Sequence, residues 1–177
     1  GGGTLALGGT VVRENDRWDY RLQADIDSIR VRYPESLSSV INGRLTYSGT
    51  DLRSLLSGEV VVNRVTIGSD LSLGNVIASL AEPTQTPASN QVLVNMGLSV
   101  RIASVPNLLI ETGLIRNVQA SMDLQLSGTA VSPSLLGDLN FTQGELLFQG
   151  SRYTINRSDI NFYNPFRVEP VVNIELE

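Results

Sequence analysis

The sequence contains no cysteine, no histidine and no lysine, so its 13 basic residues are all arginine. Without cysteine or histidine the chain has no thiol nucleophile, no imidazole base and no ordinary zinc site. Without lysine it has neither the lysine of a phosphate-binding loop nor a Schiff-base amine. The net charge of −5 argues against a nucleic-acid partner. We therefore expect no metal, no cofactor and no nucleic acid.

Aromatic residues are also scarce, at 6% of the chain. The composition still permits a carboxylate pair of the glycosidase type. However, nearly all of the 18 acidic residues fall at polar positions of alternating segments or in turns, and the rings that would bind a sugar are missing. We predict that the protein is not an enzyme and that it has no catalytic residues.

Long hydrophobic runs are absent, so no segment is apolar enough for a membrane-spanning helix. The first residues lack the basic and apolar regions of a signal peptide. The last residues, Ile174 to Glu177, stop inside an alternating pattern rather than at a turn. We interpret the chain as a fragment of a longer protein, with any membrane contact made by segments outside it.

Strand-type alternation is the dominant feature of the sequence. Val, Ile and Thr make up 40 of the 177 residues, an enrichment typical of strands. Apolar residues alternate from Trp18 to Ile26, and the phase then slips by one to Ile29 and Val31, as a β-bulge would cause. Similar runs recur to the end of the chain, and each predicted strand has about six to eight residues. Glycines such as Gly8 and Gly9 are interpreted as residues of turns and strand starts. The pattern predicts an all-β fold in one domain, 1–177, with an elongated, curved, mostly antiparallel sheet.

Two segments depart from simple alternation. Leu73, Val76, Ile77 and Leu80 have helical spacing, which predicts a short amphipathic helix near 71–81. The polar, proline-containing stretch 82–91 is predicted to be a loop. There is also an internal repeat, about 43–68 and 122–147, in which a Ser-Gly-Thr sequence precedes a strand that begins with glycine. This repeat indicates a sheet extended by repeating one supersecondary unit.

The apolar face of the predicted sheet has two interpretations. It is either the filled core of a β-sandwich or barrel, or the lining of an open trough for an apolar ligand. About a dozen one-faced strands need a partner surface, and one short helix cannot cover them, which favours the trough. The residues predicted to line it are Leu45, Tyr47, Val60, Val62, Met96, Leu98, Val100, Ile102, Met122, Leu124, Leu126, Leu139, Phe141, Phe148 and Phe162.

The C-terminal third carries five motifs in order. They are a strand that begins at Gly137, the sequence Gly-x-Leu-x-Phe-x-Gly at 144–150, Tyr-x-Ile at 153–155, Phe-x-Asn-Pro at 162–165, and a strand led by Pro170. This series resembles the C-terminal domain of the TamB family, within the AsmA-like group of envelope proteins. The Ser-Gly-Thr turns upstream fit the same pattern, so the resemblance spans most of the chain.

The resemblance implies a periplasmic domain of a two-membrane bacterium, in a protein anchored in the inner membrane that reaches an Omp85-type, TamA-like outer-membrane partner. It also implies a sheet curled into a "β-taco" that carries phospholipid acyl chains and supports outer-membrane protein assembly. An alternative is an interaction module whose edges accept a partner's β-strand. A closed β-sandwich with a structural role is a third possibility. Because cut sheet edges can pair, some self-association of the fragment is expected.

Overall fold

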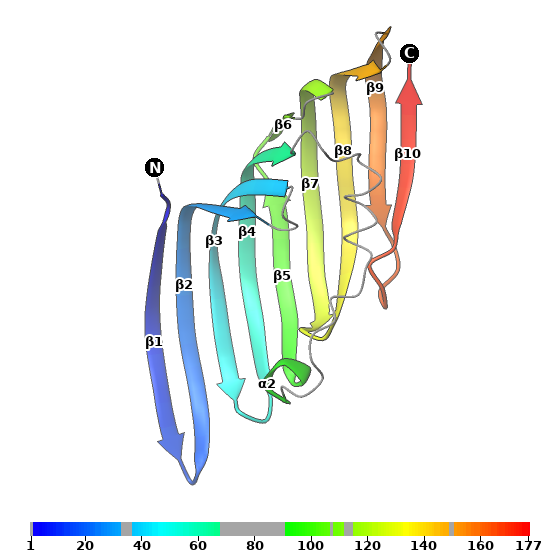
Figure 1. Ribbon diagram of the computed structural model, residues 1–177. Coiled ribbons are helices and arrows are strands. Elements are labelled where there is room, and N and C mark those ends of the chain that lie inside the picture. Colours follow the sequence, from blue (N-terminus) through cyan, green and yellow to red (C-terminus); the bar gives the residue numbers. More distant parts are fainter. Residues whose placement is uncertain (1, 33–36, 68–90, 107, 112–114, 149–150) are drawn as a thin grey trace.

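The computed structural model describes residues 2–32, 37–67, 91–106, 108–111, 115–148 and 151–177. They form one ten-stranded sheet with the order β1-β2-β3-β4-β5-β7-β8-β9-β10, and β6 pairs with β4 and β7 (Figure 1). The strands are β1 Thr4–Glu14, β2 Arg17–Arg32, β3 Leu37–Thr50, β4 Ser54–Ile67, β5 Met96–Ser104, β6 Leu108–Glu111, β7 Ile115–Thr129, β8 Ser132–Phe148, β9 Ser151–Phe162 and β10 Pro170–Leu176.

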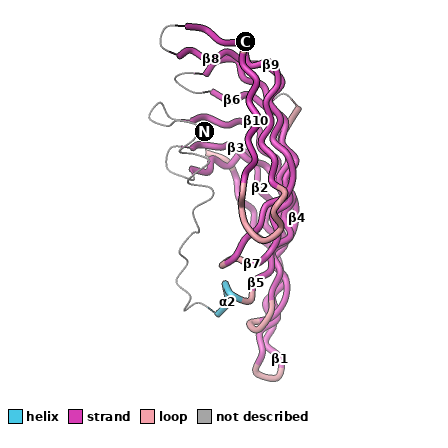
Figure 2. The backbone as a smooth tube through the Cα atoms, turned by 90° about the vertical axis from the view of Figure 1, so that its right-hand side faces the viewer, coloured by secondary structure: helices cyan, strands magenta, loops and turns pink. Residues whose placement is uncertain are grey.

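The sheet is curved and mostly antiparallel, which confirms the predicted fold class. Only the pairing of β4 with β5 and with β6 is parallel among the described strands. Figure 2 shows the sheet nearly edge-on, with the upper strand ends turned toward one side. Strands β1 and β10 form the two edges of the sheet, so its ends do not meet in a barrel.

The upper strand ends turn where β-bulges interrupt the register. In β2 the register with β3 shifts between Ile26 and Ile29, which confirms the bulge predicted from the phase slip. Ser28 at this bulge has a φ of 54°, and its backbone N–H donates to the Asn42 side chain at 2.6 Å. Asn117 in β7, with a φ of 53°, lies at a second register shift. Because a bulge increases local bending and twist, these positions curve the sheet.

The prediction of many strands of six to eight residues is wrong, because the strands are fewer and longer. The runs Val60-Val62 and Val65-Ile67 belong to one strand, β4, which has 14 residues. The runs at Leu139 and Leu146 likewise form the 17-residue β8. A bulge changes which face a residue occupies without ending the pairing, so each phase change imitates a strand end in the sequence.

Gly8 and Gly9 lie in the middle of β1, so their interpretation as residues of turns or strand starts is also wrong. Gly9 faces Leu22 of β2 with a φ of 138°. A Cβ at this position would lie 2.0 Å from the Arg21 carbonyl oxygen, so the close approach of the two strands requires glycine. The glycine pair is therefore a feature of the strand itself.

The only helix among the described residues is α2, Gln91–Val94, at the lower end of β5. The sequence did not predict it, and it begins at the last residue of the predicted loop 82–91. Its four residues are too short for an amphipathic pattern to be recognised. The predicted helix near 71–81 and the rest of that loop lie outside the described residues.

The two copies of the internal repeat occupy matching hairpins, β3–β4 and β7–β8. Thr50 and Thr129 each accept a hydrogen bond from a turn amide, Arg53 N–H at 3.3 Å and Ser132 N–H at 3.2 Å. In the second strand of each hairpin, Gly58 and Gly137 have φ values of 138° and 120°. The shared Ser-Gly-Thr sequence thus stabilises the turn through the threonine hydroxyl.

Candidate functional site: the concave face

The strand register brings the predicted apolar residues onto one face of the sheet. Leu45 faces Gly58, which faces Val100, which faces Leu126. One row further, Val60 faces Ile102, and Ile102 faces Leu124. Met122 and Leu139 face each other in the next strand pair. Tyr47, Met96, Leu98, Val62, Phe141 and Phe162 lie in phase with these rows, whereas Phe148 lies at the end of β8 opposite Ser151.

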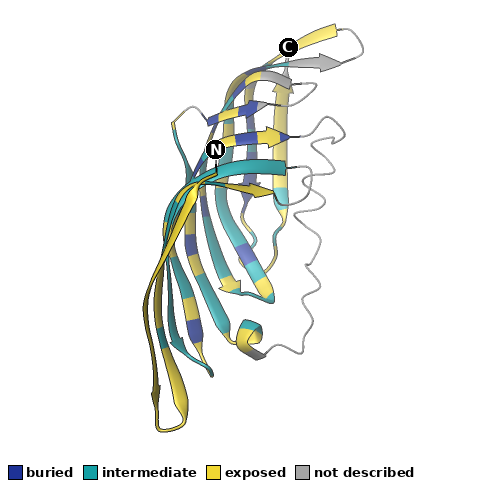
Figure 3. Ribbon diagram, turned by 60° about the vertical axis from the view of Figure 1, so that its left-hand side comes forward, coloured by how far each residue is buried: buried dark blue, intermediate teal, exposed yellow. Residues whose placement is uncertain are grey.

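This apolar face is concave because it lines the inside of the bend. Val62, Val65, Leu108, Val118 and their neighbours form one buried cluster where β4, β6 and β7 meet. Leu108 is completely inaccessible to solvent. A second cluster contains Leu124, Ile160 and Phe162. Figure 3 shows buried segments in these central and upper parts of the sheet.

Burial falls steeply toward the β1 edge. Leu5, Leu7 and Val11 continue the apolar rows onto β1 but are 51%, 73% and 49% exposed. At the other edge, Ile174 of β10 is 58% exposed. The concave face is therefore a packed core at the bend and an open apolar surface at the edges. We call the open part formed by β1–β3 the open trough.

The predicted lining residues divide between these two regions. Val62, Val100, Leu124 and Phe162 are buried and act as core. Leu45 and Tyr47 are half-buried and border the open trough. The prediction omitted the exposed apolar residues of β1, whose alternation is interrupted by Gly8 and Gly9. The alternation of Leu5, Leu7 and Val11 is the signal that could have identified them.

The convex face carries the charges. Arg101 makes a two-pronged contact with Asp123, with nitrogen–oxygen distances of 3.0 Å and 2.9 Å, and lies 3.4 Å from Glu59. Arg44 donates to Asp25 at 2.5 Å. The hydrogen bond from Arg101 lowers the pKa of Asp123, and those from Arg44 and Gln23 lower the pKa of Asp25. These alternating charges keep the outer face solvated.

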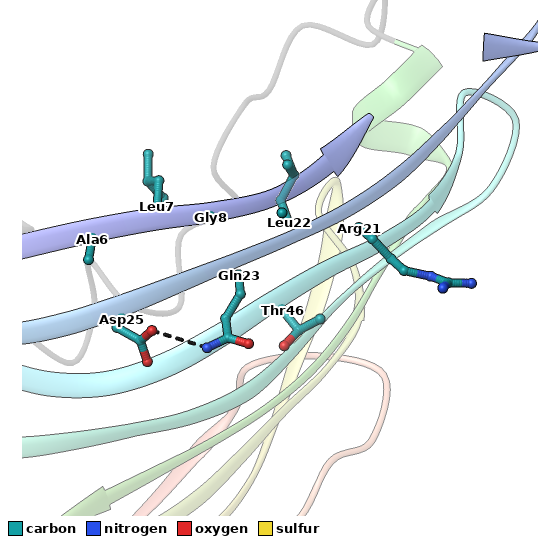
Figure 4. Close-up of a pocket in the computed structure, with 9 residues that line it drawn as sticks. Ala6, Leu7, Gly8, Arg21, Leu22, Gln23, Asp25 and Thr46 are labelled. Atoms are coloured by element: carbon teal, nitrogen blue, oxygen red, sulfur yellow. Dashed lines mark hydrogen bonds between the residues drawn. The ribbon is translucent and has the colours of Figure 1, made fainter. Parts of the chain in front are cut away.

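The opposition of the two faces is visible at β1 and β2. Figure 4 shows Leu7 and Leu22 on one side of the sheet and Gln23, Asp25 and Thr46 on the other. Gln23 donates a hydrogen bond to Asp25 at 3.0 Å on the polar side. A depression of about 550 Å³ lies here, next to the small residues Ala6 and Gly8.

A long, open, curved, mostly antiparallel sheet with an apolar concave face and a charged convex face is the architecture that the name β-taco describes. Among the described residues, no helix is long and apolar enough to cross a membrane. The same residues contain no group of acidic side chains arranged to hold a metal ion.

Comparison with known families agrees with this class. The family model of the TamB C-terminal domain matches residues 1–177, and the chain belongs to this family. The family is a non-catalytic one that acts in the translocation and assembly module of the Gram-negative envelope, together with an outer-membrane partner. No curated protein and no solved structure gave a significant match.

Proposed function

We propose that this domain carries phospholipid acyl chains along its concave face between the inner and outer membranes. It would do so in the periplasm, as part of a protein anchored in the inner membrane, and would thereby support outer-membrane assembly. The observation that carries the proposal is the apolar surface that remains exposed on β1 and β2, and half-buried on β3, after the bend has formed its core.

The energetics of such a surface suit transport. Transfer of one methylene group from water to an apolar environment is favourable by about 0.8 kcal/mol. An acyl chain can therefore be held without a specific polar contact. The rows of Leu, Val and Ile are similar from strand to strand. An acyl chain would therefore slide across them with little change in free energy. No proton transfer or covalent step is needed.

Native mass spectrometry of the gently purified protein, followed by lipid extraction, tests the proposal. Leu7→Asp places a charge on the exposed concave surface and should remove co-purifying phospholipid. Thr10→Asp places the same charge on the convex side of the same strand, opposite Arg21, and should retain it. Both residues are exposed, so neither variant should unfold, and far-ultraviolet circular dichroism checks this.

A ligand-free protein in every sample would contradict lipid carriage. Equal loss of lipid in both variants would show that the two faces do not differ. Substitution of the buried Leu124 is less informative, because an Asp there would disrupt the core around Ile160 and Phe162.

A second candidate function rests on the sheet edges. Every residue of β1 is exposed, and β1 pairs only with β2 among the described strands. Such an edge can accept a strand from the outer-membrane partner or from a nascent outer-membrane protein. Proline substitutions along β1 would then abolish partner capture, whereas Leu7→Asp would leave it intact.

A further inference from the structure

Aromatic residues of β2 and β3 lie close together near the lower end of the open trough. The ring centroids of Tyr20 and Tyr47 are 5.8 Å apart, with the ring planes at 47°. Trp18, the single tryptophan of the chain, lies two residues before Tyr20 on the same face of β2 and is 42% exposed. Figure 1 shows the β1–β2 hairpin extending below its neighbours. We call Trp18, Tyr20 and Tyr47 the aromatic rim.

One arginine, Arg13, lies beside the aromatic rim. The guanidinium carbon of Arg13 lies 5.5 Å from the Trp18 ring centroid, and the register of β1 with β2 puts this pair in phase with Leu7 on the concave face. In the described strands, Arg13 is the only charged residue that the register assigns to this face. Every other strand charge falls on the convex side. Core packing does not explain a single cationic side chain at the border of an apolar surface, whereas a bound anionic group would.

Charges of both signs surround Arg13. Its guanidinium pairs with the carboxylate of Asp16, and both side chains are well exposed, so the pair is weak and open to exchange. An adjoining depression of about 390 Å³ has Trp18 and the turn residue Asn15 in its lining. Its other lining residues, Glu14, Arg17, Asp19 and Thr50, lie on the convex side by the strand register. On the concave side the hairpin therefore offers the Arg13 guanidinium for a phosphate and the neighbouring Asp16 carboxylate for an ammonium group.

Tryptophan and tyrosine suit a boundary between an apolar and a wet environment, because each has an apolar ring and a polar group. The aromatic rim lies at such a boundary, between the leucines of the trough and the charged hairpin tip. We propose that the rim binds the polar end of a zwitterionic glycerophospholipid, with the phosphate at Arg13, the glycerol beside Trp18, and the acyl chains directed toward Leu22 and Leu7. This inference rests on the proposed function.

Quenching of Trp18 fluorescence by spin-labelled phosphatidylcholine tests the orientation. The nitroxide is placed either near the glycerol or near the methyl end of an acyl chain. The inference predicts several-fold stronger quenching by the label near the glycerol. Equal quenching, or stronger quenching by the label at the methyl end, overturns it.

A second reporter controls for the position of the label. Leu7→Trp combined with Trp18→Phe moves the tryptophan to an exposed site opposite Ala24, six residues or about 20 Å along β2 from the original position. The preference should reverse at this reporter, with the label at the methyl end quenching more strongly. An unchanged preference would show that the lipid has no fixed orientation and would overturn the inference.

Arg13 is tested with a probe that lacks phosphate. Arg13→Gln should weaken binding of phosphatidylcholine about tenfold and leave binding of spin-labelled diacylglycerol unchanged. Arg17→Gln, at the tip but off the concave face, should change neither. If Arg13→Gln leaves both ligands unaffected, Arg13 does not bind phosphate and the inference is wrong.

The two proposals fail in different ways. If native mass spectrometry detects bound phospholipid but Trp18 shows no dependence on label position, lipid carriage stands and the aromatic rim is not its headgroup site. If no lipid binds at all, both proposals are overturned.

Discussion

The bend at β4, β6 and β7 and the open trough at β1–β3 are built from the same alternating pattern, yet they differ in what the apolar residues contact. At the bend, Val62, Leu108 and Val118 pack against one another and lose nearly all contact with water. In the open trough, Leu5 and Leu7 lie on the same face of the sheet and remain largely exposed. Alternation determines the face, whereas the bulges determine whether that face becomes core or surface.

The two regions should differ most in their sensitivity to truncated side chains. Leu108→Ala creates a cavity in the core and should lower the free energy of unfolding by about 2–5 kcal/mol. Leu7 in the open trough and Leu109, next to Leu108 in the sequence, have exposed side chains. Leu7→Ala and Leu109→Ala should each change the free energy of unfolding by no more than about 0.5 kcal/mol. Urea unfolding measures all three, and similar losses would erase the distinction between bend and trough.

Glycine substitutions should show the next largest contrast. In the packed half, a Cβ at Gly137 would lie 2.1 Å from the Asp123 carbonyl oxygen, and the residue has a φ of 120°. Gly137→Ala should therefore cost about 1–3 kcal/mol. In the open half the cost depends on the position. Gly9→Ala would meet the same strain, with a Cβ 2.0 Å from the Arg21 carbonyl oxygen and a φ of 138°, whereas at Gly8 a Cβ meets nothing within 4 Å, so Gly8→Ala should be neutral or slightly stabilising. Thermal unfolding compares them, and a harmless Gly137→Ala would contradict the close strand approach.

Amide hydrogen exchange should sharpen the comparison without any substitution. The central strands β4 and β7 are paired on both sides and covered at the bend, so their amides should exchange most slowly. The edge strand β1 is exposed along its whole length and should exchange fastest among the long strands. Addition of phospholipid should slow exchange in β1 and β2 and leave β7 unchanged. The opposite distribution would place the ligand at the bend.

The smallest effect should come from the charges of the convex face. The pKa values of Asp25 and Asp123 are lowered in the folded state by hydrogen bonds from Arg44 and Arg101. Their contribution to stability is therefore present above the pKa of an unfolded Asp and is lost as the pH falls through the lowered, folded pKa. Because both carboxylates are exposed, stability should fall only gradually with decreasing pH. Arg101→Gln should slightly reduce the fall of the melting temperature at acid pH, because Asp123 then loses the hydrogen bond that lowers its pKa. A steeper fall in this variant would contradict the stabilising role of the Arg101–Asp123 pair.

Much of the fold follows from the sequence because strand alternation is a local property. The slip after Ile26 correctly marked a bulge, and the period-two runs correctly grouped most trough and core residues on one face. The parallel pairing of β4 with β5 could not be predicted, since it depends on the connection between them rather than on either strand. Val62 is buried and Leu7 is exposed. This difference could not be predicted either, because it depends on contacts between residues far apart in the sequence.

Photochemical cross-linking tests the central claim most directly. A phospholipid with a photoreactive group in its acyl chain is bound to the wild-type protein, irradiated, and its attachment sites are mapped by peptide mass spectrometry. The account predicts attachment at concave residues of β1–β3, such as Leu5, Leu7 and Leu22, and little at the buried Val62 and Leu108. Attachment mainly at convex residues such as Thr10, Gln23 and Thr46, or equally on both faces, would contradict it.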